Sequence, residues 1–576
     1  MFRLRLLSAG LTAVLLLGAT SPTAAPDTQD AAYTALAQQY YTQWLQLNPV
    51  SAAQLGLHDY DAQLGDYSGK AVQAQLAHDQ AFLDRLATID RSKLSPEVKI
   101  DATLLEYTLR DDLLQNGTLG QWKHDPDIYT QTASGAVFGT MSRDYAPLAK
   151  RLSFAVSRER AIPAMLAQAE NDMGSVDSVT QRISYEDASG AISFFQHDVP
   201  ETFAPVRDAA LQVQFKSANA GVVKAMSQYA RWIKTLKPSG TYAIGSDAYR
   251  KRLLYEDGLD MPVDQYLTIG ERALAQTRAQ FIAVAKRIDP KKTPLDVYLS
   301  ITKTHPQPDE LLPTAQSDLV KLRGFIAAKH IVTLPPDANI KVIETPPFQR
   351  ATTEAAEDSA GPLETVATQA YYYVTPVDPT WNAQQKEEYL AEFNDFEFPI
   401  ISAHEVYPGH FTNFAIDRHL DLSLTRKLSQ SSEFAEGWAH YSEQMMVDQG
   451  WGNGDPRVRL AQLDEALLRN CRYVVGVKLH TQGMTIPAAE KLFTHECFQT
   501  KQIAVGETLR GTQDPMYGYY TLGKLMILKL RADYKKKLGS AYTLEKFHDA
   551  LLAHGDPPLP LLRPILLGAD DDGHPL

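Results

Sequence analysis

Residues 401–410 read Ile401-Ser402-Ala403-His404-Glu405-Val406-Tyr407-Pro408-Gly409-His410, so two histidines and a carboxylate fall within seven residues. A second stretch, about thirty residues later, reads Phe434-Ala435-Glu436-Gly437-Trp438-Ala439-His440-Tyr441-Ser442-Glu443. Two histidines beside a glutamate, followed downstream by a helical glutamate, are the ligand types of a catalytic zinc site with its general base. The spacing departs from the usual His-Glu-x-x-His, because the fourth residue after His404 is Pro408.

A continuous helix through the first stretch would separate its histidines. Each residue advances about 100°, so His404 and His410 would stand about 120° apart around the helix and could not share a metal. Pro408 removes a backbone donor and clashes with the preceding turn, while Gly409 tolerates unusual dihedral angles. We therefore expect the helix to break at Pro408-Gly409, so that the two extra residues loop out and His410 turns back toward the metal.

The second stretch fits one uninterrupted helix. Glu436, His440 and Glu443 are spaced i, i+4 and i+7 and share one face. The other side is apolar and comprises Phe434, Trp438, Tyr441 and Met445. A solvated face with ordinary i, i+4 pairs would give the same pattern, but the first stretch favours a metal as the partner of this polar stripe.

These residue types suggest individual roles. The predicted metal ligands are His404, His410 and Glu436, which leave an open position for water and favour Zn²⁺ over iron or manganese. Glu405 follows a ligand but points elsewhere, so it is the predicted general base that activates the zinc-bound water. Glu443 or His440 is expected to contact a ligand imidazole on the side away from the metal and so fix its tautomer.

The composition is that of a globular protein, with 44% hydrophobic and 22% charged residues among 576. A net charge of −13 argues against a partner made of nucleic acid or anionic lipid. Arg3, Arg5 and the apolar run from Leu6 to Leu17 are typical of a signal peptide, predicted over residues 1–25. No later run is long enough to span a bilayer, and no cysteine lies near the expected cleavage site, so we expect neither an integral membrane protein nor a lipid anchor. The mature chain is expected in the periplasm or outside the cell.

The chain has two cysteines, Cys471 and Cys497. An oxidising compartment permits a disulfide between them if their segments are antiparallel helices. Two buried thiols are the alternative, and the sequence does not decide between them.

Helical periodicity dominates the chain. It predicts helices over 31–47, 72–86, 96–114, 146–171, 206–234 and 262–288, and helical structure from Asn382 to about Leu552, followed by a Pro-rich tail. Three β-rich runs interrupt the pattern, at 331–334, 340–343 and 370–374. We therefore predict a mainly α fold, a large two-lobed helical body with a deep cleft and a small sheet beside the zinc-site helices. Residues 26–576 should form a single catalytic unit, with an N-terminal lobe over about 26–330 and a zinc-site lobe over about 331–576.

The paired motifs, His404-Glu405-x-x-Pro408-Gly409-His410 and Glu436-Gly437-Trp438-Ala439-x-Tyr441-x-Glu443, resemble those of the bacterial domain-of-unknown-function family 885. The resemblance covers nearly the whole mature chain and includes Arg472…His480…Gly483 and Tyr520-x-x-Gly523. Members often carry a second histidine after Pro-Gly-His, where this chain has Phe411, and an aliphatic residue where it has His440. The family is grouped with gluzincin metallopeptidases of thermolysin-like and angiotensin-converting-enzyme-like type.

This resemblance implies a helical cleft with an edge strand that pairs with an extended peptide. The strand around Tyr371 and Tyr373 is the expected one. It also implies a histidine or tyrosine that stabilises the oxyanion, for which His480 and Tyr520 are the candidates and Tyr519 a weaker one. Arg472 could bind a peptide carboxylate, although a salt bridge is its more ordinary role.

The leading hypothesis is an exported zinc metallopeptidase that hydrolyses peptide bonds, chiefly in short peptides. A zinc hydrolase of another amide, such as a cell-wall peptide or an acylated amino acid, is one alternative. A non-catalytic peptide-binding protein with a vestigial metal site is the other, although Glu405 weighs against it. The sequence does not indicate the cleavage preference, exopeptidase or endopeptidase action, or the oligomeric state.

Overall fold

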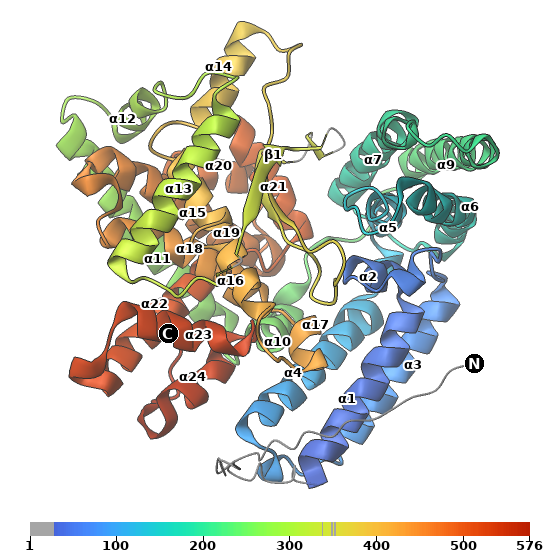
Figure 1. The fold of residues 1–576 in the computed structure, drawn as a ribbon, viewed down its shortest axis with the longest axis horizontal. Helices are drawn as coiled ribbons and strands as arrows, with labels where there is room; N and C mark the ends of the chain where they lie inside the picture. Colours follow the sequence, from blue (N-terminus) through green and yellow to red (C-terminus); the bar gives the residue numbers. More distant parts are fainter. Residues whose placement is uncertain (1–27, 337, 347–348, 351–352) are drawn as a thin grey trace, which may run out of the picture.

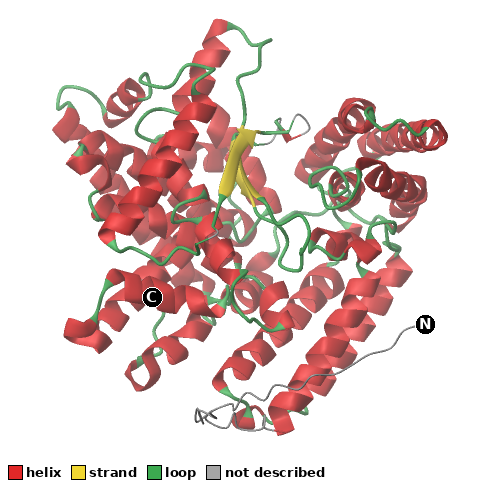
Figure 2. Cartoon of the chain, in the orientation of Figure 1, coloured by secondary structure: helices red, strands yellow, loops and turns green. Residues whose placement is uncertain are grey.

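The computed structural model describes residues 28–576 except 337, 347–348 and 351–352. Within that range the chain is mainly helical, with one small three-stranded sheet (Figures 1 and 2). The predicted mainly α fold class is confirmed. The expected signal peptide, residues 1–25, lies outside the described residues.

The N-terminal helices pack as a bundle, drawn in blue in Figure 1. They are α1 (Thr28–Leu47), α2 (Pro49–Gln54), α3 (Gly69–Leu86) and α4 (Pro96–Asp112). Their hydrophobic core is rich in aromatic residues, including Tyr33, Tyr40 and Phe82. Prolines open α2 and α4, because the first turn of a helix does not need the missing N–H.

A second helical group has a hydrophobic core of its own. It contains α5 (Asp127–Phe138), α6 (Leu148–Asp172), α7 (Ser178–Ser193), α8 (Val199–Phe203) and α9 (Ala209–Thr235). The long helices α6 and α9 lie against each other and match the helices predicted over 146–171 and 206–234.

The third and largest group surrounds one extensive core. It comprises α10 (Gly245–Asp257), α11 (Val263–Ile288), α12 (Pro294–Ile301), α13 (Leu311–Lys329), α14 (Ala383–Glu392), α15 (Phe398–Glu405), α16 (His410–Asp417), α18 (Ser432–Asp448), α19 (Pro456–Thr481), α20 (Ile486–Glu496), α21 (Lys501–Gln513), α22 (Tyr519–Leu538), α23 (Leu544–Leu551) and α24 (Leu559–Leu567). The short helix α17 (Leu424–Leu428) packs instead on α1 and α4 of the N-terminal bundle. Because α10–α13 share this core, the packing changes near residue 245 rather than near 330, where the expected lobes divide. The expected Pro-rich tail is also corrected, since Leu559–Leu567 is helical and packs on α22.

The sheet has the order β1-β3-β2, formed by β1 (Ile340–Glu344), β3 (Ala370–Val374) and β2 (Ala355–Asp358). β3 pairs in parallel with β1 and antiparallel with β2. The strand predicted over 331–334 is wrong. That segment is instead held by α23 side chains, since His548 Nδ1 lies 2.7 Å from the Ile331 carbonyl and Thr333 N donates to Asp549 over 2.8 Å. β2 was missed, because Ala-Ala-Glu-Asp has little intrinsic preference for a strand.

Cys471 of α19 and Cys497 at the end of α20 form a disulfide across a sequence separation of 26. The structure therefore favours the bridge over two free thiols. No helix in the described ranges has both the length and the apolar character needed to cross a membrane.

Replacing both cysteines by alanine should lower the free energy of unfolding by about 3 kcal/mol, because the bridge limits the unfolded chain. Urea denaturation of the wild type and the double variant measures the difference. Two thiols that react with iodoacetamide in the unreduced, unfolded wild type would contradict the bridge.

Candidate metal centre

The helix that carries His404 breaks where the sequence predicts. α15 ends at Glu405, and α16 begins at His410 after a non-helical link that contains a cis Tyr407-Pro408 peptide bond. Gly409 N donates to the Ala403 carbonyl over 2.9 Å, which folds the link back onto the end of α15. The prediction of a break at Pro408-Gly409 is confirmed.

Only glycine fits at position 409. A Cβ atom there would lie 1.7 Å from the His404 carbonyl oxygen and 2.5 Å from that of Ala403. Two further bonds hold the link in place: Thr412 Oγ1 donates to the Val406 carbonyl over 3.0 Å, and Trp438 Nε1 of α18 donates to the Pro408 carbonyl over 2.8 Å. Trp438 thus joins the first motif to the second.

The break brings the two histidines to the same carboxylate. His404 Nε2 lies 3.5 Å and His410 Nε2 lies 3.3 Å from Glu436 Oε2. One ligand atom from each of the three residues lies within 4.8 Å of the others, and this is the one such group that could hold a metal among the described residues. Phe411, where relatives often carry histidine, is instead buried in the core.

The group fits a zinc ion. Two atoms bound at about 2.0–2.1 Å and at the tetrahedral angle lie about 3.3 Å apart, close to both separations from Glu436 Oε2. That oxygen is buried and has no hydrogen-bond partner among the described residues. Burial alone would raise the pKa of Glu436, but the two neighbouring histidines hold it well below its usual range. The arrangement is one in which a cation satisfies a buried carboxylate.

Glu443 supports the centre from behind. Its Oε1 lies 2.7 Å from His404 Nδ1, which leaves His404 Nε2 to face Glu436. Its Oε2 lies 3.0 Å from His440 Nδ1, and Arg469 lies 3.7 Å from Oε1. Burial and the charge of Lys524 lower the pKa of His440 to about 3, so this histidine is neutral near pH 7. Glu443 therefore contacts a candidate ligand directly, whereas His440 contacts only Glu443 in this chain of bonds.

Two glycines bring α22 against the metal-site helix α18. A Cβ on Gly523 would lie 1.9 Å from the Glu433 carbonyl oxygen, and one on Gly437 would lie 2.5 Å from Gly523 Cα. The close crossing carries Tyr520 to the centre, where its ring centroid is 6.4 Å from that of His404. Burial and the charge of Glu436 raise the pKa of Tyr520, so its hydroxyl stays protonated and can donate.

The structure does not bring His480 to this centre. His480 is buried on α19, its Nε2 lies 2.8 Å from the Gly511 carbonyl, and its ring contacts Tyr242. Eight residues, or about 12 Å of helix, separate it from Arg472, which lies over the Tyr520 ring. The assignment of His480 to the oxyanion is therefore corrected, because its ring nitrogen serves the packing of α19 on α21.

Arg472 is committed to a salt bridge. Its Nε and Nη2 donate to the two oxygens of Glu507 over 2.7 and 2.8 Å. The expected role as a carboxylate clamp is therefore not supported by its contacts. Arg510, which the sequence did not indicate, donates to the Tyr520 hydroxyl over 3.1 Å. No spacing connects α21 with the motifs, so only the fold shows this contact.

The expected edge strand is also corrected. Tyr371 and Tyr373 lie in β3, which has a neighbour on both sides and offers no free edge. Tyr373 is buried, and its hydroxyl donates to Asp358 over 2.9 Å. The strand beside the centre is β2, whose Glu357 N–H points outward and donates to Glu405 Oε2 over 3.0 Å. The sequence identified β3 because its residues have the strongest preference for a strand. The edge strand beside Glu405 is β2, whose residues have a weaker preference.

The fold and centre define a mainly helical protein with a candidate His-His-Glu metal site. The family described as "Bacterial protein of unknown function (DUF885)" matches residues 49–566, and the chain belongs to that family. No curated protein matches it.

Two solved structures share the fold. One is a "putative lipoprotein of unknown function" from Shewanella oneidensis, with 24% identity and a TM-score of 0.80, over 93% of this chain and 99% of that one. The other is a "putative lipoprotein" from Colwellia psychrerythraea, with 18% identity and a TM-score of 0.79, over 94% and 99%.

Gly409→Ala should abolish zinc binding, because the added Cβ cannot lie 1.7 Å from the His404 carbonyl and the link must open. Zinc content after dialysis measures the effect, with circular dichroism to show that the variant is folded. Gly506→Ala is the matched control, since a Cβ there meets nothing within 4 Å. Equal zinc content in Gly409→Ala and the control would refute the proposed importance of the link.

Proposed function

We propose that this protein is an exported, zinc-dependent metallopeptidase that hydrolyses peptide bonds in short peptides and is related to the gluzincins. The observation that carries the proposal is the convergence of His404, His410 and Glu436, with Glu405 directly after the first ligand. Two histidines, a carboxylate and an adjacent glutamate are the parts that this chemistry requires.

A zinc ion held by His404, His410 and Glu436 would lower the pKa of a water molecule and polarise the scissile carbonyl. The chain's own residues then do the proton transfer. Glu405 takes the proton from the attacking water and passes it to the leaving amine. The Glu357 N–H, which donates to Glu405 Oε2, orients this carboxylate.

Tyr520 is the proposed oxyanion donor. It is the predicted candidate that lies against His404, and its hydroxyl also accepts a hydrogen bond from Arg510, which makes it a better donor. The outer edge of β2, beside Glu405, is the proposed place where the substrate backbone pairs. This replaces β3 in the role suggested by the family resemblance.

Short peptides are proposed because the centre is recessed. The side chains of His404, His410 and Glu436 expose only 7%, 13% and 25% of their surface. A folded protein could not bring a peptide bond to such a site without unfolding locally. Export is supported by the N-terminal residues typical of a signal peptide, by the Cys471–Cys497 bridge, and by the description of both similar structures as lipoproteins.

The zinc-loaded protein should contain about one zinc per chain and cleave a peptide library, as read by mass spectrometry. Glu405→Gln should keep its zinc and lose about 10²–10⁴-fold in kcat, because the base is gone while the ligands remain. Glu388→Gln, an exposed glutamate of α14, is the control and should behave as wild type. No cleavage by the zinc-loaded wild type, or full activity in Glu405→Gln, would refute the proposal.

Tyr520→Phe should lower kcat by about 10²-fold, with little change in KM, since its hydroxyl is needed in the transition state. Tyr519→Phe tests the weaker candidate, whose hydroxyl donates to Asp514 over 3.0 Å, and should lower kcat less than Tyr520→Phe does. Steady-state kinetics on one cleaved peptide compares the two variants. A larger loss in Tyr519→Phe would exchange the two roles.

A further inference from the structure

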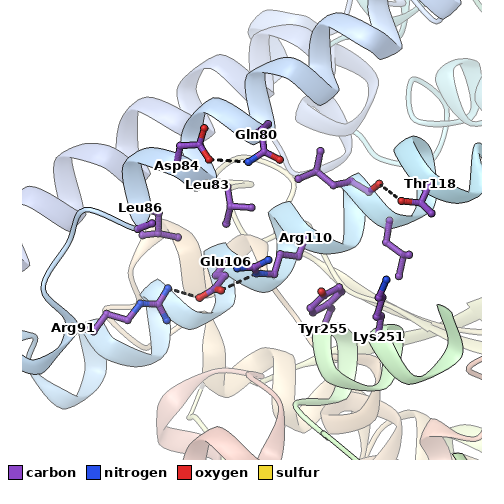
Figure 3. Close-up of a pocket in the computed structure, with 13 residues that line it drawn as sticks. Gln80, Leu83, Asp84, Leu86, Arg91, Glu106, Arg110, Thr118, Lys251 and Tyr255 are labelled. Carbon is purple, nitrogen blue, oxygen red and sulfur yellow. Dashed lines mark hydrogen bonds and ion pairs between the residues drawn. The ribbon is translucent and has the colours of Figure 1, made fainter. Parts of the chain in front are cut away.

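Two cavities lie beside α4, outside the metal centre. The first, of about 540 Å³, lies between α3, α4 and α10 (Figure 3). Arg91 and Arg110 both bind Glu106, Asp84 accepts a hydrogen bond from the neutral Gln80, and Lys251 also lines the cavity. This cavity has mixed charge and carries no inference about a ligand.

The second cavity, of about 600 Å³, lies where the N-terminal bundle meets the third helical group, which contains the candidate metal centre. Six aromatic residues line it: Tyr40, Tyr41, Trp44, Tyr107, Tyr255 and Tyr519. Four carboxyl residues line it as well: Asp111, Asp112, Glu256 and Asp257. The lining contains no lysine, arginine or histidine. We refer to it as the aromatic–acidic cavity.

The carboxyl groups of this cavity are incompletely satisfied. Asp257 is only 2% exposed, and its Oδ2 has no hydrogen-bond partner among the described residues, nor does Asp111 Oδ1. Arg252 pairs with Glu256 and is the adjacent compensating cation. Burial, together with the charge of Glu256, raises the pKa of Asp257 well above its usual value. Buried carboxyls without partners are costly, and a bound cation would remove that cost.

The spacing of the carboxyl groups in this cavity favours an organic cation over a metal ion as its ligand. Among the described residues, only His404, His410 and Glu436 bring ligand atoms close enough together for a metal. The cavity carboxyls are therefore spread around the space rather than converging on one point. Aromatic faces attract ammonium groups, and together with surrounding carboxylates they form a site for an amine.

The aromatic–acidic cavity adjoins the metal centre. Ser432 lines it and precedes Glu436 by four residues on the same face of α18, a rise of about 6 Å. Tyr519 also lines it, and its ring centroid is 4.8 Å from that of Tyr520. Six ångströms correspond to roughly two residues of an extended peptide.

We propose that the aromatic–acidic cavity binds the positively charged amine of the substrate, roughly two residues from the bond that is cleaved. The inference rests on the proposed peptidase function for its substrate, but not for the binding of the amine itself. The amine can be the free N-terminus of a short peptide or the side chain of a basic residue, because both offer the same ammonium group.

Binding without catalysis tests the cavity directly. Isothermal titration into the zinc-loaded Glu405→Gln chain would use leucinamide, N-acetyl-lysinamide and N-acetyl-leucinamide. These probes carry an α-amine, a side-chain amine and no amine, respectively. At least one amine should bind about tenfold more tightly than the neutral probe. Whichever amine binds identifies the source of the ammonium group, and equal affinity for all three probes would overturn the proposal.

Variants locate the site. Asp257→Asn and Asp111→Asn keep the side-chain shape, and each should weaken binding of the amine about tenfold without changing that of the neutral probe. Two positions are used because Asp257 is fully buried and its variant could fail to fold. Asp84→Asn, in the cavity of Figure 3, is the matched control and should bind as the parent does. Unchanged affinity in a folded Asp111→Asn or Asp257→Asn chain would overturn the proposal.

Kinetics separate this inference from the peptidase proposal. In the wild-type background, Asp111→Asn should raise KM about tenfold for a peptide with the preferred amine, and leave its N-acetylated or norleucine counterpart unchanged. Hydrolysis without any preference for an amine would refute amine binding by the cavity and leave the proposed peptidase function standing. Amine binding without hydrolysis would refute the proposed peptidase function and leave amine binding by the cavity standing.

Discussion

The carbonyl oxygen of His404 occupies the place where a side chain on residue 409 would begin. This single contact fixes the path of the chain between α15 and α16, and therefore the position of His410 relative to His404. A helix that continued would carry the two imidazoles to different sides. Glycine supplies the space, while Thr412 and Trp438 satisfy the carbonyls of Val406 and Pro408 that the break releases. The break is thus held by side-chain hydrogen bonds from Thr412 and Trp438 rather than being a defect in a helix.

A second backbone contact completes the centre. Gly437 and Gly523 allow α18 and α22 to touch along their main chains, so that Tyr520 reaches the side of Glu436 occupied by His404. Both contacts leave no room for a Cβ, and such contacts locate side chains more rigidly than interlocking apolar residues that can repack. Three glycines therefore position the candidate metal centre as much as the side chains of His404, His410 and Glu436 do.

The sequence was sufficient where the rules are local. The clash of Pro408, the i, i+4, i+7 spacing of Glu436, His440 and Glu443, and the apolar stripes of α1 and α11 all depend on near neighbours. Prediction from the sequence failed where contacts between distant segments determine the structure. β2 becomes the edge strand beside Glu405 although its residues favour no strand, and His480 turns to Gly511 because α21 packs there. Arg510 is brought to Tyr520 by the fold alone, so no spacing in the sequence could have indicated it.

The charge balance around the candidate centre favours the binding of a cation. Glu443 is buried and Glu436 is half-buried, and each lies beside histidines, but His440 is held neutral by burial and by the charge of Lys524. His404 lies between the two glutamates, and although burial opposes it, Glu436 and Glu443 raise the pKa of His404 to about 9. Without a metal, a proton on this imidazole would balance the carboxylates. A divalent ion can replace that proton, since neutral imidazole is the form that binds metals. The same carboxylates that attract the proton therefore favour the metal.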